Sequence, residues 1–323
     1  MTIKDSIYGQ FAVEPVIREL INTKEIQRLK KIHQGGASHL VNSLWNVTRY
    51  EHSIGVMLLV RIMGGSIEEQ IAGLLHDMSH TAFSHVVDFA LNNKEEDYHE
   101  KIFDQIILGS EIPNILKSYG YDPTDIIFNE SKWTILEKSA PSLCADRVDY
   151  TLRDMFHYGY ITNDEINKFI KNLSVENGEI VIKSIEDAEW FVDIYYKEVI
   201  GFFMNPLNVY GYDRLSKALK IALELKEIEL EDLLEDDEYV LNLLKKSSSK
   251  EIIELIKSLN YNVKVKEDCC NYDIHQVKKT RTIDPCICIN DIVYKASEKS
   301  SLVQVLNQNA LKKSQEGVYI KVF

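Results

Sequence analysis

Histidines and carboxylates are concentrated in one part of the chain. Seven of the nine histidines lie between His33 and His99, and acidic residues are interleaved with them. Imidazole and carboxylate ligands together suit borderline to hard divalent metal ions, and a centre with open coordination positions can activate water. This pattern indicates a hydrolase. Its members are His52, His76, Asp77, His80, His85, Asp88 and His99, together with Asp146 much later in the chain.

Other interpretations of these residues are weaker. A single buried histidine is more often a hydrogen-bonded core residue than a metal ligand, so we assign no function to His33, His39, His157 and His275. Burying the whole set of ionisable groups without partners or a metal would cost several kcal/mol for each. A zinc protease would require His-Glu-x-x-His on one helix, and the chain contains no such motif.

The composition is that of an ordinary globular protein, with 45% hydrophobic and 27% charged residues in a chain of 323. This length allows one large domain, or a main domain with a smaller appendage. The net charge of −13 argues against nucleic acid as a partner, because affinity for a phosphate backbone comes mainly from Lys and Arg. A small phosphorylated substrate is compatible with this charge, since a metal and a few arginines create a local positive pocket.

Signals for membranes and secretion are missing from the sequence. No run of 18 apolar residues appears, and the N-terminus carries no apolar targeting segment. The five cysteines form no disulfide framework. We therefore expect a cytoplasmic protein with reduced thiols and no membrane partner.

Two strongly apolar helices are predicted at 51–63 and 67–78, separated by Gly64-Gly65. The second is apolar on most sides, which indicates a central, buried position. A short glycine turn between them allows the two helices to pack antiparallel. The pair should therefore form the centre of a helical fold.

These helices determine how the metal-ligating side chains can meet. His76 and His80 share one helical face, whereas Asp77 points about 100° away, so the helix end must face the metal. His52 lies in the preceding helix, one turn from its start. Asp146, on a third helix, closes the site in the way that helical metal centres are commonly built.

The whole chain is predicted to be mainly α, with a helical core, short β-hairpins and a small α+β C-terminal region. A shift in composition near residue 225 places a main domain at 1–224 and a small region of unknown role at 225–323. Helices are expected from near Pro15 and at 24–33, 97–118, 141–158, 184–199, 209–225 and 224–238, and strands within 6–14, 173–183, 261–294 and 318–323.

A series of short motifs runs through residues 3–215. With these motifs the chain resembles the HD-domain metal-dependent phosphohydrolases, and more narrowly their dNTP triphosphohydrolase branch, which includes the SAM- and HD-domain-containing enzyme and bacterial relatives, here without a SAM domain. The motifs are Asp5-Ser-Ile-Tyr-Gly, Gln27-Arg-Leu, Gln34-Gly-Gly, Arg49-Tyr-Glu-His-Ser-Ile-Gly, Ile71-Ala-Gly-Leu-Leu-His-Asp-Met-Ser-His-Thr-Ala-Phe-Ser-His, Tyr98-His-Glu and Asp146-Arg-Val-Asp-Tyr-Thr-Leu-Arg-Asp.

The resemblance implies a role for each residue of the site. One divalent ion (Mn, Fe, Mg, Zn, Ni or Co) would be held by two histidines and two aspartates, and a second group would support catalysis. Arg49 would bind a phosphate through its planar donor fork. The implied metal ligands are His52, His76, Asp77 and Asp146; the catalytic group is His80, His85, Asp88 and His99; and Gln34, Tyr150 and Asp154 would contact the sugar, with Tyr210 beside the base.

The implied reaction is attack of water on the α-phosphorus of a deoxynucleoside triphosphate, releasing deoxynucleoside and triphosphate. His99 or His85 would transfer protons. The alternatives are another HD phosphohydrolase, acting on nucleoside monophosphates, cyclic or signalling nucleotides, and a non-catalytic nucleotide-binding protein.

Regulation is where the chain departs from the family pattern. Members activated by guanine nucleotides read the base with an acid, a Gln and an Arg, and the matching residues here are Asn22, Gln27 and Lys30. The basic C-terminal lobe of such enzymes is replaced by a short acidic one. We therefore expect activity without a nucleotide activator, in a homo-oligomer, most simply a homodimer.

Overall fold

Helices α3 (Arg49–Ile62) and α4 (Ile67–Leu75) lie at the centre of the structure, a computed structural model that describes residues 2–323. The first begins at a capping box in which Thr48 and Glu51 each bond the other's backbone N–H, and the second begins at a serine cap. Most residues of both helices are buried. The predicted central helical pair is thus present.

The fold is mainly helical, as predicted. A π-helical turn at Val199–Phe203 and short 3₁₀ segments at Leu29–Lys31, Gly36–Leu40, Glu130–Lys132 and Glu231–Leu234 connect longer elements. The remaining helices are α1 (Pro15–Ile21), α2 (Lys24–Arg28), α5 (Val86–Ala90), α6 (Tyr98–Leu108), α7 (Ile112–Ser118), α8 (Pro123–Ile127), α9 (Ala145–His157), α10 (Asn163–Lys171), α11 (Ile185–Glu198), α12 (Pro206–Glu224), α13 (Asp237–Lys245), α14 (Lys250–Ser258), α15 (Ala296–Lys299) and α16 (Ser301–Glu316).

Three small sheets lie around the helices. One is the hairpin β1–β2, one is four-stranded in the order β3–β4–β7–β8, and one is three-stranded in the order β5–β9–β6. The strands are β1 (Thr2–Asp5), β2 (Gly9–Ala12), β3 (Leu173–Glu176), β4 (Glu179–Ile182), β5 (Val265–Glu267), β6 (Ile274–Gln276), β7 (Cys286–Ile289), β8 (Ile292–Lys295) and β9 (Val318–Val322).

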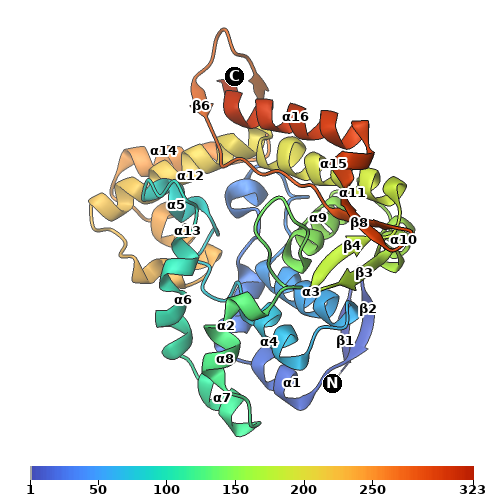
Figure 1. Ribbon diagram of the computed structural model, residues 1–323. Helices are drawn as coiled ribbons and strands as arrows, with labels where there is room; N and C mark the ends of the chain where they lie inside the picture. Colours follow the sequence, from blue (N-terminus) through green and yellow to red (C-terminus); the bar gives the residue numbers. More distant parts are fainter. Residues whose placement is uncertain (1) are drawn as a thin grey trace.

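The C-terminal region is closely joined to the preceding part of the chain. β7 pairs in parallel with β4, with Val181 opposite Cys286, so strands from both sides of residue 225 share one sheet. α16 packs on α11, and Figure 1 shows these two helices side by side with the C-terminal strands at their ends. The division into domains 1–224 and 225–323 stays a prediction.

Buried apolar side chains form two clusters. The larger contains most of α3, α4, α9 and α11 and extends from Ile3 to Ile320. The smaller joins α5, α12, α13 and α14. The candidate site lies where elements of both clusters meet.

Two predicted helices differ from the structure. The segment 97–118 is two helices, α6 and α7, because the chain turns at Gly109 and Ser110, whose hydroxyl bonds the Ile107 carbonyl. The predicted acidic helix at 224–238 is wrong. The chain leaves the α-helical conformation at Lys226, which has a φ of 54°, and resumes it only at α13, after the short 3₁₀ segment Glu231–Leu234.

Within residues 2–323, no helix combines the length and the apolarity that a bilayer crossing requires.

Candidate active site

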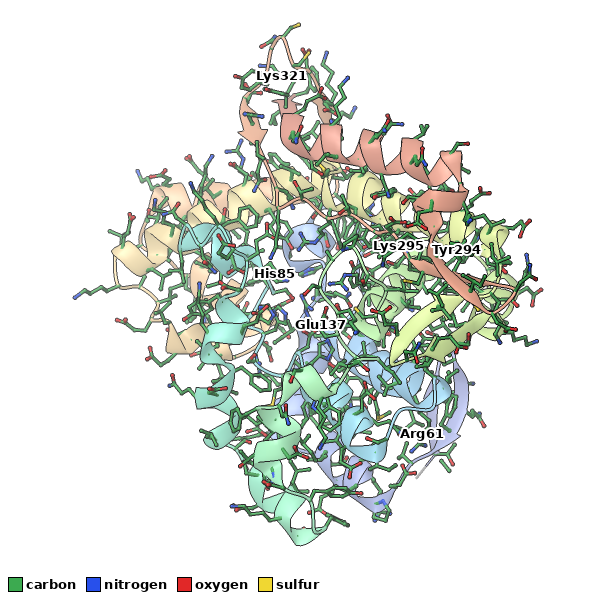
Figure 2. All side chains as sticks on the ribbon, in the orientation of Figure 1. Arg61, His85, Glu137, Tyr294, Lys295 and Lys321 are labelled. Atoms are coloured by element: carbon green, nitrogen blue, oxygen red, sulfur yellow. The ribbon has the colours of Figure 1, made fainter. Side chains whose placement is uncertain are left out.

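One large cavity, of about 720 Å³, opens among the helices. Its walls come from α3, α6, α9 and α12, from the turn after α4, and from residues 277–282 near the C-terminus. Figure 2 shows His85 and Glu137, which both line it, near the middle of the molecule. All the residues predicted for the site line this cavity except Asp88 and Tyr210.

A carboxylate-rich cluster, formed by His52, His76, Asp77 and Asp146, lies at one wall. His52 Nε2 is 3.0 Å from Asp146 Oδ1 and 3.6 Å from Asp77 Oδ2. His76 Nε2 is 3.5 Å from Asp77 Oδ1 and 3.6 Å from Asp146 Oδ1. Two imidazole nitrogens and one Asp146 oxygen therefore lie around one point, and Asp77 lies beside both imidazoles with its Oδ2 bonded to Arg49.

The ends of three helices bring these side chains together. His52 and Asp146 lie in the first turns of α3 and α9, and His76 is the residue that ends α4. The other nitrogen of His76, Nδ1, is 2.8 Å from the Gly73 carbonyl oxygen, so the ring is fixed with Nε2 toward the cluster. That Nε2 is buried and has no hydrogen-bond partner within residues 2–323.

The cluster fits a divalent cation. The ligand atoms of His52, His76 and Asp146 all lie within 4.8 Å of one another. Although burial opposes ionisation, Arg49 and neighbouring imidazoles hold the pKa of Asp77 well below its usual range, and the hydrogen bond from His52 together with the nearby ring of His76 does the same for Asp146. Two ionised carboxylates beside an unpartnered imidazole nitrogen are the ligands that such an ion requires.

Behind His52 lies a carboxylate that the sequence analysis did not identify. Asp149 Oδ2 is 2.8 Å from His52 Nδ1, which leaves His52 Nε2 facing the cluster. Arg153 donates to both oxygens of Asp149, at 3.0 and 2.9 Å, and its Nη1 is 3.0 Å from Asp5 Oδ2. All four side chains are buried. Although burial alone would lower it, the hydrogen bonds with Asp146 and Asp149 raise the pKa of His52 to about 10.

Close helix packing makes this network possible. A Cβ at Gly55 would lie 2.0 Å from Arg153 Nη2 and 2.1 Å from Asp149 Oδ1, so only glycine fits there. The sequence did carry a signal for Asp149. Residues three apart share a helix face, so Asp149 lies beside Asp146 on α9.

An imidazole cluster, formed by His80, His85 and His99, lies next to the first cluster. The rings of His80 and His99 stack at a centroid distance of 3.9 Å, and His85 meets both edge-on. Asp88 lies behind His85, with Oδ2 3.1 Å from His85 Nδ1. Asp88 also accepts hydrogen bonds from Asn93 and the Tyr98 backbone, so it is fully engaged in holding this segment.

Burial dominates the charge state of two of these rings. It lowers the pKa of His99 to about 3, with repulsion from His85 adding to the effect. It also lowers the pKa of His80 well below the usual value, assisted by the nearby charge of Arg49. His80 and His99 are therefore neutral imidazoles near pH 7, able to accept a hydrogen bond or a proton.

Unpartnered acceptor groups line another part of the cavity. Asp154 is buried, and neither of its oxygens has a hydrogen-bond partner within residues 2–323; the same is true of Gln34 Oε1. Burial raises the pKa of Asp154 to about 6 and raises that of neighbouring Glu198 as well. The π-helical turn begins directly after Glu198 and brings Phe202 and Phe203 into the cavity wall.

Tyr210 lies outside the cavity. Its hydroxyl donates to the Ser258 carbonyl oxygen at 3.3 Å, and its ring lies under Arg214. Tyr212, which the sequence analysis did not select, lines the cavity instead. On a helix, a difference of two residues turns the side chain to another face.

Residues 277–282 supply basic groups to the cavity wall. Lys278, Lys279 and Arg281 all line the cavity, together with Arg49. The C-terminal lobe, predicted to be short and acidic, thus still brings basic side chains to the cavity. The net charge of a whole region does not describe the few side chains that face the cavity.

The residues that match the guanine-binding positions of nucleotide-activated family members form hydrogen bonds with their sequence neighbours. Asn22 Nδ2 donates to the Arg18 carbonyl at 2.7 Å, and Lys30 Nζ donates to Gln27 Oε1 at 2.7 Å. None of the three residues Asn22, Gln27 and Lys30 lines the cavity.

Comparison with known proteins identifies the family. The HD domain family matches residues 49–154. The chain is 55% identical to uncharacterized protein YdhJ of Bacillus subtilis, with coverage of 100% of this chain and 99% of that protein. It is 31% identical to the metal-dependent phosphohydrolase cns2 of Cordyceps militaris, with coverage of 88% of this chain and 84% of that protein.

Two further matches bear on the fold and on a more distant relationship. A crystal structure of a phosphohydrolase from Bacteroides thetaiotaomicron has a TM-score of 0.79 at 20% identity, over 100% of this chain and 99% of that chain. The human deoxynucleoside triphosphate triphosphohydrolase SAMHD1 is 28% identical over 52% of this chain, which is 35% of that protein.

Proposed function

The chain belongs to the HD-domain family of metal-dependent phosphohydrolases, and we propose that it hydrolyses deoxynucleoside triphosphates to a deoxynucleoside and inorganic triphosphate. The distant similarity to SAMHD1 supports this substrate class. The observation that carries the proposal is that the carboxylate-rich cluster and the unpartnered acceptors Gln34 and Asp154 line one cavity. One end suits a phosphate-bound metal, and the other suits a sugar hydroxyl.

We assign one divalent ion to the carboxylate-rich cluster. When bound, this ion would supply Lewis-acid polarisation of a phosphate oxygen and orientation of the attacking water. Asp149, through its hydrogen bond to His52 Nδ1, keeps His52 Nε2 directed at the cluster. Arg49 lies beside it, bonded to Asp77 at 2.6 Å and Ser84 at 3.0 Å, where its guanidinium can bind a phosphate.

The imidazole cluster is assigned to proton transfer. The water loses a proton as its oxygen bonds to the α-phosphorus, and the 5′-oxygen of the sugar takes a proton as its bond to that phosphorus breaks. A neutral His99 can accept the first proton. His85, oriented by Asp88 behind its Nδ1, has its Nε2 left for the leaving oxygen. His80 supports His99 by ring stacking.

The nucleoside is assigned to the end of the cavity at Asp154. A buried carboxylate without a donor suits the 3′-hydroxyl of a sugar, and Gln34 offers a second acceptor. Tyr150 lies between Tyr195 and Phe203, with ring centroids 6.4 and 6.1 Å away, and this packing limits movement of its ring. A fixed aromatic ring beside the sugar would exclude a 2′-oxygen sterically.

We also propose that the protein acts in the cytoplasm as a homodimer, on a free nucleotide. All five cysteines are unpaired, which supports a reducing compartment.

The test is a panel of dNTPs, NTPs, nucleoside monophosphates and cyclic nucleotides, each incubated with protein loaded in turn with Mn, Fe, Mg, Zn, Ni or Co. Ion chromatography then identifies the phosphate product. We expect inorganic triphosphate and deoxynucleoside in equal amounts from dNTPs. Accumulation of dNDP or dNMP, or activity confined to monophosphates or cyclic nucleotides, would overturn the proposal in favour of another HD phosphohydrolase reaction.

A further inference from the structure

A connecting segment between two sheets crosses the cavity. Residues 277–282, here called the strap, join β6 to the chain before β7, and Figure 1 shows this connection running from β6 towards β8. Its ends are held: Gln276 pairs with Val318, and the backbone N–H of Asp284 donates to the Pro141 carbonyl at 2.8 Å. Within residues 2–323 no backbone-to-backbone hydrogen bond involves the strap itself.

Side chains alone therefore fix the strap over the cavity. Arg281 Nη2 is 3.1 Å from Glu96 Oε2, and its guanidinium lies 5.5 Å from the ring centre of Phe203. Lys278 Nζ lies 4.2 Å from the ring centre of Tyr212. Rings hold the cations in place without neutralising them.

The positive charges of the strap exceed the negative charge beside them. Glu96 is the carboxylate that Lys278 and Arg281 share, and it interacts with His85 as well. Burial lowers the pKa of Lys278 to about 8, only partly offset by Glu96 and reinforced by Arg281. The buried ammonium of Lys278 shares its one carboxylate with Arg281, so its charge raises the free energy of the folded protein. An anion bound in the cavity would lower that free energy.

The surroundings identify the class of anion. The charges of Arg49 and Arg281 both lower the pKa of the Tyr212 hydroxyl, so both groups lie near this ring. His85 lowers the pKa of Glu96, as Lys278 and Arg281 do. The strap thus lies beside the imidazole cluster through Glu96, and Arg281 also reaches Tyr150 and Tyr195, so the strap borders both the proposed phosphate site and the proposed sugar site. An anion that extends from Arg49 to the strap must carry several charges along its length, as a polyphosphate does.

We propose that the strap is a polyphosphate-binding element in which Lys278 and Arg281 bind the phosphates beyond the α-phosphate. This assignment rests on the proposed function for the identity of the substrate, since it places the tail of a nucleoside triphosphate here. A nucleoside monophosphate would not reach these groups. The strap would therefore select triphosphates over monophosphates.

The test uses metal-loaded full-length protein and inorganic triphosphate as the probe, titrated by calorimetry. We expect Lys278→Ala and Arg281→Ala each to weaken triphosphate binding by roughly 10- to 100-fold, the range for loss of a charge-assisted contact. Orthophosphate affinity should change less than about threefold. The control is Lys312→Ala on α16, an exposed lysine outside the cavity, which should leave both affinities unchanged.

A further variant tests whether misfolding explains weaker triphosphate binding in the Lys278 and Arg281 variants. Glu96→Gln removes the counter-charge and should tighten triphosphate binding several-fold, an effect opposite in sign to any damage. Triphosphate affinity unchanged in the Lys278/Arg281 double variant, or no binding to the wild type, would overturn the strap proposal. Strap-dependent triphosphate binding together with failure to release triphosphate from dNTPs would instead retain the strap and overturn the proposed function.

Discussion

The carboxylate-rich cluster and the imidazole cluster contain the same kind of side chain a few ångströms apart, in opposite surroundings. His52 is hydrogen-bonded to two aspartates and has a pKa raised to about 10, whereas His99 is stacked on another imidazole and has a pKa lowered to about 3. Both rings are buried, and in both cases burial by itself disfavours the charged form. The difference lies in the carboxylates.

The contrast between the two clusters shows how one cavity can provide both a cation site and a site for proton transfer. Where aspartates surround imidazoles, the local excess of negative charge attracts a cation. His80 and His99, which lie among imidazoles and an arginine, remain neutral and can exchange protons with a substrate. Asp77 lies on the boundary, with Oδ1 3.3 Å from His80 Nε2 and Oδ2 2.6 Å from Arg49.

The largest expected effect is on the carboxylate-rich side. Asp146→Asn removes a negative charge and a ligand oxygen, so bound metal should be lost and turnover should fall more than about 10³-fold. Elemental analysis and steady-state rates of the same sample measure both. Asp193→Asn, at a half-buried aspartate on α11 that lies outside the cavity and pairs with Lys197, is the matched control. Full metal content in the Asp146 variant would show that the carboxylate-rich cluster does not hold the ion through Asp146.

The imidazole side should respond differently. His99→Ala should lower turnover by roughly 10²–10⁴-fold through loss of proton transfer, while metal content stays near that of the wild type. His275→Ala, an exposed histidine outside the cavity, should change neither quantity. Simultaneous loss of the ion in the His99 variant would make this ring a metal ligand and remove the distinction between the clusters.

A smaller effect is expected behind His52. Asp149→Asn keeps the shape of the side chain but removes the negative charge that orients His52, so metal affinity should fall by about 10- to 100-fold. Competition with a chelator measures that affinity, and thermal unfolding checks that the Arg153 network has not collapsed. An unchanged affinity in a folded variant would show that Asp149 supports only the fold.

The smallest expected effect concerns activation. Asn22 and Lys30 are engaged in local hydrogen bonds, and the cavity needs neither of them. Activity on dATP should therefore change less than about twofold when GTP is added, with no change of assembly state by light scattering. Strict dependence on GTP would reveal an activator site built from other residues.

Local sequence patterns were sufficient to predict the helices, which are stabilised by residues close together in the sequence. The apolar periods of α3 and α4 predicted both helices, and these helices place His52 and His76. The capping box at Thr48, which begins α3 at Arg49 rather than at residue 51, was not recognised. The break at Gly109 and the absence of an α-helix directly after Lys226 were missed because their signals are single residues within otherwise helical patterns.

Long-range partners account for the remaining omissions. Asp149 meets His52 across 97 positions of sequence, and the strap reaches the cavity only because β6 pairs with β9 and β7 pairs with β4. Nothing in the local sequence of Lys278 or Arg281 indicates which cavity they will face. Such residues follow from topology, which spacing alone does not determine.

The most direct test of the comparison is a crystal of the metal-loaded protein measured at the absorption edge of its ion. We expect one anomalous peak per chain, bound by His52, His76, Asp77 and Asp146, and none among His80, His85 and His99. A peak between His80, His85 and His99, with the four proposed ligands left without one, would contradict this expectation.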